Sequence, residues 1–233
     1  MPNLMYALIV AGGEGQRLRP HTEDRPKAMV EVNGKPLLEY QITWLRNNGV
    51  TNAVILCGYK AEVIQNYFKD GEGFGVGIEY CIEETPLGRG GAFKQGFSKI
   101  PASEQLVIGA NGDNINDQRL APMLEFHRSN SALVTVMLTR LRSPYGIATV
   151  LESGQVTGFE EKPLLPHWLN AGVYVFSREV FDLFPAKGDH EDSTFPALAK
   201  QGRLFGYKSD AYWRTVDNVK DLIEASQELK EKR

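Results

Sequence analysis

Glycines and cations gather in the first thirty residues, in a pattern suited to binding phosphate. Directly after a short apolar run, residues 11–20 read AGGEGQRLRP. Glycines let backbone N–H groups turn toward an anion, arginine binds phosphate oxygens with two donors, and lysine acts as a point charge. The sequence therefore predicts a polyphosphate site, and four residues supply its positive charge: Arg17, Arg19, Arg25 and Lys27.

Two better-known phosphate loops do not match this stretch. The dinucleotide fingerprint needs a third glycine where Leu18 stands, and the Walker A loop needs a lysine and a hydroxyl residue after Gly15. An ordinary structural turn is the alternative interpretation, since glycine also favours turns.

A candidate metal ligand follows a later apolar run. Asn111, Gly112 and Asp113 come shortly after the run at 106–108. A carboxylate there can hold Mg²⁺, which takes hard oxygen ligands and usually keeps waters and substrate phosphates. The alternative is a plain turn, because all three residue types favour turns.

The elements that must position these residues follow an alternating pattern. Apolar runs alternate with helical periodicity, which predicts an α/β layered fold with a mainly parallel sheet. In such open sheets ligands bind at the carboxyl ends of the strands, where the glycine-rich loop falls. The expected strands of this first half are 4–10, 53–57, 78–81 and 106–108, and the expected helices are 36–48, 61–68 and 91–97.

The second half shows a different pattern, with strand-like runs close together. A turn at 152–155 separates two of these runs, as in a hairpin. The runs are 133–138, 147–150, 156–159 and 172–176. A final helix is expected from about Asn218, and its apolar face is predicted to hold Val219, Leu222, Ile223 and Ser226.

Composition narrows the class of protein. The 233 residues are 42% hydrophobic and 24% charged, which is typical of a globular domain. The net charge of −3 argues against a general binder of nucleic acid or membranes. Two cysteines are too few for a disulfide scaffold, and the first apolar run is too short for a signal peptide or membrane span. We therefore expect a cytoplasmic protein with neither nucleic acid nor membrane as partner.

The glycine-rich stretch at 11–20, with Arg25-Pro26-Lys27 behind it, resembles the signature of the sugar-1-phosphate nucleotidyltransferases. These enzymes join a nucleoside triphosphate (NTP) to a sugar 1-phosphate and release pyrophosphate. Further motifs follow in the order of that family, and the resemblance runs from about residue 4 to 225. They are ETPLGRGGA at 84–92, NGD at 111–113, YG at 145–146, EEKP at 160–163 and NAGVYVF at 170–176.

The resemblance implies a fold and a division of the chain. The fold is a Rossmann-like, mainly parallel sheet flanked by helices, with an antiparallel mixed second half, known as the nucleotide-diphospho-sugar transferase fold. It implies a single domain over 1–233, with a nucleotide-binding half to about residue 130 and a sugar-binding half from about 131. No appended domain is expected, and the oligomeric state stays open, with a homo-oligomer as one option.

The resemblance also implies roles for individual residues. Arg17 would neutralise the leaving pyrophosphate, Lys27 would hold the triphosphate, and Lys162 would hold the sugar phosphate. Because nucleotidyl transfer starts from an ionised nucleophile, catalysis is mostly positioning and charge neutralisation. The residues expected to bind the nucleotide are Ala11, Gly12, Gly13, Gly15, Glu83, Pro86, Leu87 and Gly88. Those expected to bind the sugar are Gly146, Glu161 and Asn170.

The metal ligands implied by the resemblance are Asp113 and a second aspartate, with Mg²⁺ as cofactor. Many family members carry Trp-x-Asp near the end, but this chain has Trp213-Arg214-Thr215, with Asp217 two residues later. Asp217 is the expected replacement, as in some cytidylyltransferase relatives. The alternative is that Asp217 caps the final helix.

Glu83 distinguishes this chain from relatives that use thymidine or uridine nucleotides, which tend to carry glutamine there. A carboxylate accepts hydrogen bonds only, which suits the N1–H and amino donors of guanine. Together with Pro86, Leu87 and Gly88 it resembles the guanylyltransferase branch, whose members use mannose- or heptose-type 1-phosphates. The alternative is that the Glu83 side chain only faces solvent, and so the sequence favours GTP only weakly.

The expected function is Mg²⁺-dependent transfer of a nucleoside monophosphate from an NTP to a mannose-, heptose- or glucose-type 1-phosphate. A transferase specific for UTP, CTP or dTTP is one alternative. Another is a non-catalytic regulatory homologue, which loss of Arg17, Lys27 or Asp113 would favour, but all three are present. A glycosyltransferase using nucleotide sugars would need an Asp-x-Asp pair, which Asp113-Asn114-Ile115 does not supply.

Overall fold

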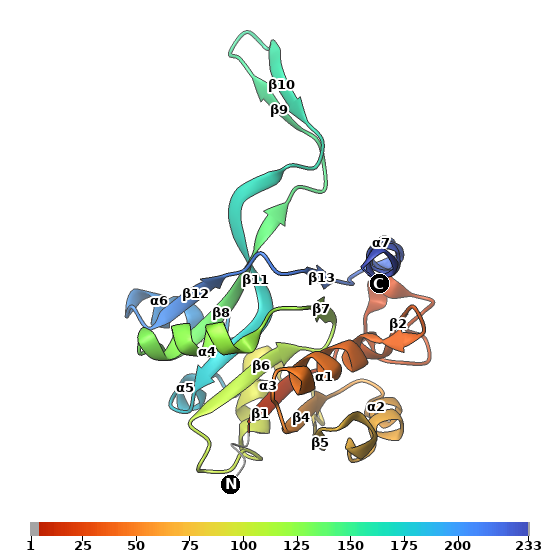
Figure 1. Ribbon diagram of the computed structural model, residues 1–233, viewed down its shortest axis with the longest axis vertical. Coiled ribbons are helices and arrows are strands. Elements are labelled where there is room, and N and C mark those ends of the chain that lie inside the picture. The colour runs from red at the N-terminus through yellow and green to blue at the C-terminus, as the bar shows by residue number, and fades with distance from the viewer. Residues whose placement is uncertain (1–4, 233) are drawn as a thin grey trace.

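A seven-stranded sheet forms the centre of the computed structural model, which describes residues 5–232 (Figure 1). Its strand order is β12-β8-β11-β6-β1-β4-β5. Strand β11 runs antiparallel to both of its neighbours, and the other pairs are parallel. The strands are β1 Tyr6–Val10, β4 Asn52–Cys57, β5 Gly77–Ile82, β6 Leu106–Asn111, β8 Val134–Arg142, β11 Leu164–Ser177 and β12 Leu204–Lys208. The expected mainly parallel first half and antiparallel mixed second half are confirmed.

Helices cover both faces of this sheet, as the alternating pattern predicts. The expected strands and helices of the first half are all present, with small shifts at their ends, and residue 4 of the expected strand 4–10 lies outside the described residues. Helices α4, α5 and α6 were not expected. The helices are α1 Leu37–Asn47, α2 Ala61–Phe68, α3 Gly88–Phe97, α4 Leu120–Ser129, α5 Val180–Leu183, α6 Thr194–Lys200 and α7 Val219–Glu231, with short 3₁₀ helices at Gln16–Leu18, Lys27–Met29 and Glu72–Phe74. No helix among residues 5–232 is long and apolar enough to cross a membrane.

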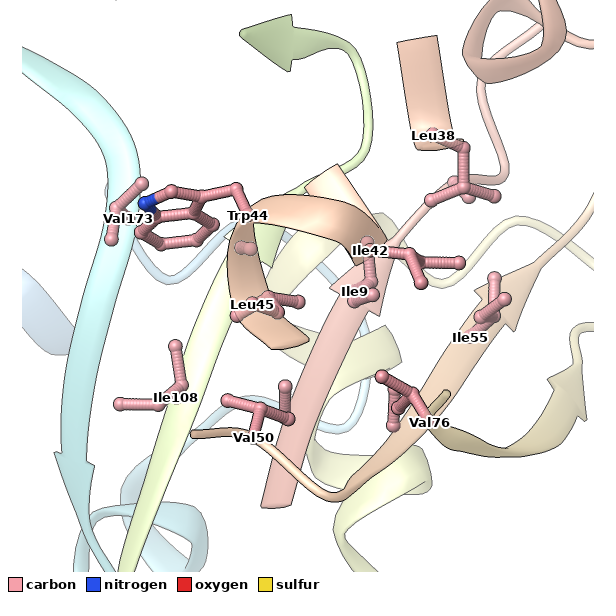
Figure 2. Close-up of a cluster of buried hydrophobic side chains, with 14 of the residues drawn as sticks. Ile9, Leu38, Ile42, Trp44, Leu45, Val50, Ile55, Val76, Ile108 and Val173 are labelled. Atoms are coloured by element: carbon pink, nitrogen blue, oxygen red, sulfur yellow. The ribbon is translucent and has the colours of Figure 1, made fainter. Parts of the chain in front are cut away.

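Helices α1, α2 and α4 cover one face of the sheet through a large apolar cluster. Figure 2 shows Trp44, Ile42 and Leu45 of α1 above the side chains of β1 and β6. The indole Nε1 of Trp44 donates to the carbonyl of Gln118 at 2.6 Å, so this buried polar atom has a partner. This packing holds β1 and β6 in place, and with them the loops that follow their carboxyl ends.

An aromatic cluster on the opposite face holds α3, α5 and α6. The rings of Phe97 and Phe181 stack at 3.7 Å between centroids, and Phe93 meets Phe176 edge to face at 5.2 Å. Edge-to-face and stacked pairs add to the energy of burial. This packing sets the position of the first turn of α3.

A third cluster ties the C-terminal segment to the N-terminal loops. Strands β7 (Asn114–Asn116) and β13 (Trp213–Thr215) pair antiparallel, and β2 (Glu31–Val32) pairs with β3 (Lys35–Pro36). Leu222 and Ala225 of α7 are buried against this unit, whereas Val219 and Ile223 are exposed. The expected apolar face of α7 was therefore wrong by part of a turn, because the helix packs along Leu222, Ala225 and the partly buried Leu229.

A hairpin stands apart from the main sheet. Strands β9 (Ile147–Val150) and β10 (Val156–Glu160) form a separate two-stranded sheet and project away from the body (Figure 1). The expected hairpin and its turn at 152–155 are confirmed. Strands β8 and β11 are longer than expected because they continue out of the main sheet toward this hairpin.

Candidate active site

The glycine-rich loop leaves β1 at the carboxyl edge of the sheet and holds Lys27. The carbonyl of Gly13 accepts a hydrogen bond from the Lys27 backbone N–H at 3.0 Å. Gly15 has a φ of 67°, and a Cβ there would lie 2.9 Å from the Cβ of Lys27. Only glycine fits this close approach without strain. The loop thus positions the lysine side chain as well as offering its own N–H groups.

Lys27 lies between two carboxylates that are far apart in the sequence. Its Nζ is 2.5 Å from Oδ2 of Asp113 and 2.6 Å from Oδ1 of Asp217. The Lys27 side chain is only 13% exposed, whereas the two aspartates are 28% and 33% exposed. Arg17 is largely exposed, and its Nη2 lies 3.3 Å from Oδ1 of Asp217. The structure therefore brings together Arg17, Lys27, Asp113 and Asp217, as the resemblance implies.

Asp217 reaches this position because the segment before it pairs with the segment after Asp113. Thr215 of β13 lies opposite Asn114 of β7. The first turn of α7 is capped by Asn218, whose side chain accepts from the Asp221 N–H while the Asp221 carboxylate accepts from the Asn218 N–H. The alternative that Asp217 caps this helix is wrong, and its carboxylate stays available to the cleft.

The charges of this group stabilise one another. Burial opposes the charge on Lys27, but Asp113 and Asp217 outweigh it, so the pKa of Lys27 lies above its ordinary value. Burial also opposes the charge on Asp217, but Lys27 and Arg17 hold its pKa below the usual range. Lys27 and Asp217 are thus both ionised at neutral pH.

The donor set suits a hard divalent cation completed by substrate. The carboxylates of Asp113 and Asp217 both contact Nζ of Lys27, and Oδ1 of Asn111 is buried without a hydrogen-bond partner in the wall of the same cleft. In the part of the chain that the structure describes, no group of three or more His, Cys, Asp or Glu side chains could hold a metal ion. Because Mg²⁺ is usually bound by one or two carboxylates plus phosphates, the residues present fit it.

The far end of the cleft is built from the segment between β5 and α3. Oε2 of Glu83 accepts a hydrogen bond from the Leu87 N–H at 3.1 Å, and burial raises the pKa of this carboxyl group, opposed by that hydrogen bond. Helix α3 begins at Gly88, three residues before the expected start. Gly88, which was expected to precede the helix, is therefore its first residue, and Gly91 lies in the helix as expected.

The glycines of α3 allow a close contact that the sequence alone did not indicate. A Cβ on Gly91 would lie 2.7 Å from the carbonyl oxygen of Ala186. The N–H of Gly90 donates to the carbonyl of Gly188 at 3.0 Å. These glycines seat the first turn of α3 against residues 186–190, which is why three of them occur here.

Arg89 and Asp189 form part of the cleft wall and were not predicted. The backbone N–H of Arg89 donates to Oδ1 of Asp189 at 2.7 Å, and its guanidinium lies 3.1 Å from Oδ2 of Asp189 and 3.0 Å from Glu191. The hydrogen bond from Arg89 lowers the pKa of Asp189. Residues 188–192 carry charged side chains typical of a solvated loop, yet His190 is fully buried among aromatic rings.

These residues line a cleft of about 690 Å³, within the range of small-molecule sites. The predicted residues in its lining are Gly12, Gly13, Lys27, Glu83, Pro86, Gly88 and Asp113. Unpredicted residues in the lining include Glu14, Tyr59, Arg89, Asn111 and Asp189. Tyr59 and Asn111 lie at or just after the carboxyl ends of β4 and β6. Because ligands bind at the carboxyl ends of strands in open sheets, the sequence could have indicated both residues. Asp189 is a hundred residues from its partner Arg89 and carries no local signal.

The other residues predicted to bind the nucleotide, Ala11, Gly15 and Leu87, do not line the cleft but contact residues that do. Ala11 is buried and its N–H donates to the carbonyl of Leu56 at 2.9 Å. Gly15 packs against Lys27, and Leu87 supplies the N–H that binds Glu83. The expected cluster of four cations does not form as a unit, because Arg25 pairs with Asp24 and Glu31.

The residues expected to bind the sugar lie outside this cleft. A Cβ on Gly146 would lie 2.4 Å from the ring of Phe159 and 3.0 Å from Glu161, so the space beside Gly146 is filled by these side chains. The Asn170 amide donates to the Tyr174 hydroxyl at 2.9 Å and its Oδ1 accepts from the Gly172 N–H. Lys162 also lies outside the lining of this cleft, and its backbone carbonyl accepts a hydrogen bond from Nη1 of Arg142 at 2.8 Å.

A second cavity of about 520 Å³ lies between β8, β11, β13 and α7. Its lining includes three arginines, Arg140, Arg142 and Arg214, together with Trp213 and Thr215. The Thr215 hydroxyl is 3.4 Å from Oδ2 of Asp217. The second cavity therefore adjoins the carboxylates that bind Lys27 in the first cleft.

Comparison with known proteins agrees with this architecture. The model of the family described as nucleotidyl transferase matches residues 6–232. Mannose-1-phosphate guanylyltransferase of Mycobacterium tuberculosis is 36% identical over 96% of this chain, and mannose-1-phosphate guanyltransferase of Pichia angusta is 34% identical over 94%. The chain spans 64% and 62% of the lengths of these two relatives.

Solved structures show the same fold. The crystal structure of HddC from Yersinia pseudotuberculosis is 25% identical, with a TM-score of 0.77, over 97% of this chain and 100% of that chain. A second structure of HddC, 24% identical and with the same TM-score and coverage, is complexed with GMP-PN. The sequence motifs, the fold and the family match together show that the chain belongs to the nucleotidyl transferase family, among the sugar-1-phosphate nucleotidyltransferases.

Proposed function

We propose that the protein transfers the GMP part of GTP to a sugar 1-phosphate of the mannose, heptose or glucose type. The observation that carries this proposal is the cleft in which Gly13, Lys27 and Asp113 lie at one end and Glu83 at the other. The strands β6, β1, β4 and β5 are neighbours in the sheet. Since neighbouring strands lie about 4.8 Å apart, the cleft spans about 14 Å, enough for a nucleoside triphosphate.

In the proposed reaction a phosphate oxygen of the sugar 1-phosphate attacks the α-phosphorus of GTP. The bond from this phosphorus to the bridging oxygen of the β-phosphate breaks, and pyrophosphate leaves with the electron pair. Lys27 and Arg17 offset the negative charge on the triphosphate and the leaving group. Asp113 and Asp217 would hold Mg²⁺, which when bound neutralises charge on the phosphates.

Guanine is proposed as the base because the Glu83 carboxylate accepts hydrogen bonds and lies in the cleft wall. The names of the relatives from Mycobacterium tuberculosis and Pichia angusta, and the GMP-PN complex of HddC, support the same base. A transferase specific for UTP, CTP or dTTP remains the outcome that would contradict this part of the proposal.

We further propose the second cavity as the place of the sugar 1-phosphate. Arg140, Arg142 and Arg214 offer donors for a phosphate group, and Thr215 joins this cavity to Asp217. Arg214 is already paired with Glu224 and Glu228 on α7. Arg140 lies over the ring of Trp168 and Arg142 donates to the Lys162 carbonyl, but neither forms an ion pair among the described residues. They are therefore the cations proposed for the incoming phosphate, and Lys162 would add to them from beside Arg142.

The experiment is a screen for pyrophosphate release, with four nucleoside triphosphates against a panel of sugar 1-phosphates. We expect the highest kcat/KM with GTP and a mannose- or heptose-type 1-phosphate. Lys27→Ala is expected to abolish release, whereas Lys35→Ala, a lysine paired with Glu39 outside the cleft, keeps it. No release with any pair of substrates would refute the proposed activity and favour a non-catalytic homologue.

A further inference from the structure

Tyr59 lies in the middle of the first cleft, between the glycine-rich loop and Glu83. The four strands that lead into this cleft stand in the order β6-β1-β4-β5. The chain reaches Asp113 just after β6, the glycine-rich loop after β1, and Glu83 directly after β5. Tyr59 follows β4, which ends at Cys57, so it leaves the sheet one strand spacing, about 4.8 Å, from the loop on one side and from Glu83 on the other.

Backbone contacts fix Tyr59 against both of these neighbours. The Tyr59 N–H donates to the carbonyl of Gly12 at 3.3 Å, and the Glu83 N–H donates to the carbonyl of Cys57 at 2.9 Å. A Cβ on Gly12 would lie 3.2 Å from the backbone nitrogen of Gly58, and a Cβ on Gly58 would lie 3.2 Å from the carbonyl oxygen of Gly12. These two glycines therefore allow the segment that carries Tyr59 to pack closely on the glycine-rich loop.

The neighbouring residue, Lys60, holds the Tyr59 ring in place. Nζ of Lys60 lies 5.4 Å from the centroid of this ring, which is a cation–π contact. The same Nζ donates to the carbonyl of Glu23 at 2.5 Å. Lys60 is thus anchored to the segment that follows the glycine-rich loop, and the ring is positioned on the cleft side of that anchor.

The Tyr59 side chain has no structural partner that would account for an aromatic ring here. Among the described residues its ring packs on no other aromatic ring and its hydroxyl has no hydrogen-bond partner. Tyr59 is half-buried, and within the described chain it brings the one aromatic residue to the lining of this cleft. The rest of that lining consists of glycines, polar or charged residues and small apolar side chains.

We propose that the Tyr59 ring stacks on the face of the guanine base and thereby favours purine over pyrimidine nucleotides. The proposal rests on the proposed function, which places the triphosphate at Lys27 and the base at Glu83. Aromatic side chains bind bases of any kind by stacking, because every base has a π-face. A purine presents two fused rings to such a face and a pyrimidine only one.

Tyr59 and Glu83 then contribute different parts of base selection. The Glu83 carboxylate accepts hydrogen bonds, so it distinguishes bases by the donors on their edge. Tyr59 contacts the face of the base, so it distinguishes them by the size of the ring system. Stacking forms when the nucleotide binds and changes little in the transition state, so it acts on affinity and not on the rate of the chemical step.

The test is isothermal titration calorimetry of the full chain with GTP, ITP and UTP in the presence of Mg²⁺. Tyr59→Ala is expected to raise the Kd for GTP about tenfold, within the range found for base–aromatic stacking. It is expected to raise the Kd for ITP by the same factor, because hypoxanthine has the same fused rings without the 2-amino donor. For UTP the increase is expected to be less than about threefold.

Two further substitutions at Tyr59 separate the ring from the hydroxyl and from apolar bulk. Tyr59→Phe is expected to bind GTP within about twofold of wild type, whereas Tyr59→Leu is expected to lose as much as Tyr59→Ala. In steady-state kinetics Tyr59→Ala is expected to raise KM for GTP and to leave kcat within about twofold. The matched control is Tyr67→Ala on α2, which removes a tyrosine 43% exposed and outside the cleft and is expected to leave the Kd for GTP unchanged.

Thermal unfolding shows which variants fold, and only folded variants are compared. A wild-type chain that binds no nucleoside triphosphate would overturn the proposed function, and this inference with it. A wild-type chain that binds GTP, together with a Tyr59→Ala variant of equal affinity, would overturn the inference alone. Equal losses for GTP and UTP, or a loss in Tyr59→Phe as large as in Tyr59→Ala, would also overturn it, because the ring would then not act by stacking on a purine.

Discussion

Replacing Asp217 by asparagine tests whether this residue supplies the second carboxylate of the site. Oδ1 of Asp217 lies 2.6 Å from Nζ of Lys27, in a side chain that is 33% exposed. A pair of unit charges at about 4 Å interacts by about 4 kcal/mol near a protein surface, and solvent screening lowers this to about 2–3 kcal/mol. If this interaction is realised in the transition state, Asp217→Asn lowers kcat about 30- to 150-fold.

The structure also predicts where the lost carboxylate can be replaced. The Thr215 hydroxyl is 3.4 Å from Oδ2 of Asp217, so an aspartate at position 215 reaches the same space. The double variant Thr215→Asp/Asp217→Asn is expected to recover about tenfold of the lost kcat. Thr215→Ala alone is expected to change kcat by less than about threefold, because it removes one weak hydrogen bond to Asp217.

The assay is pyrophosphate release from GTP and the preferred sugar 1-phosphate over a range of Mg²⁺ concentrations. Thermal unfolding checks that each variant folds. A kcat for Asp217→Asn within about threefold of wild type would refute the assignment. A double variant as slow as the single one, despite a wild-type unfolding midpoint, would show that an aspartate at position 215 cannot replace Asp217.

Two further predictions concern Arg89 in the cleft wall and the two buried histidines. Arg89→Ala is expected to lower kcat/KM for GTP about tenfold, because the loss of the ion pair frees Asp189 from the cleft wall. Steady-state kinetics with GTP test this prediction. An unchanged kcat/KM would show that the ion pair has a structural role only. Burial lowers the pKa of His127 to about 4 and that of His190 to about 3, from 6.5. Since the unfolded chain then binds more protons, each histidine stabilises the fold above its unfolded pKa, and this stability is lost as the pH falls toward the folded pKa. Urea unfolding is expected to show a loss of about 2 kcal/mol per histidine from about pH 7 to about pH 5, and the loss should be smaller in a folded His127→Asn variant. A free energy of unfolding that is flat over this range would contradict burial in the neutral form.

The sequence predicted correctly those elements whose residue pattern, an apolar run or a helical periodicity, lies within the element itself. The apolar run of β1 and the periodicity of α1 depend on neighbouring residues only, so both were placed within one or two residues of their observed bounds. The hairpin of β9 and β10 was found from its turn and its two short runs. In each case the side chains that decide the structure are adjacent in the sequence.

Elements whose position depends on distant contacts were missed or misplaced. Helix α3 begins at Gly88 because residues 186–190 accept its first turn, and nothing near Gly88 signals this. The buried face of α7 is set mainly by loops from the first forty residues, so Ile223, which was expected on the apolar face of this helix, is exposed. The segment around His190 contains charged residues typical of a surface loop, yet aromatic rings from α3 and β11 enclose it.

By itself the sequence determined the chemistry available to this protein: a glycine-rich loop suited to phosphate, Lys27, Asp113 and a carboxylate at Glu83 in an α/β fold. The tertiary structure decided which of these groups meet. It joined Asp217 to Asp113 through the pairing of β13 with β7, placed Asp189 in the cleft, and left Arg25 outside it. The physical reason is that a side chain's type is local, whereas its neighbours are set by strand pairing and packing between segments up to two hundred residues apart.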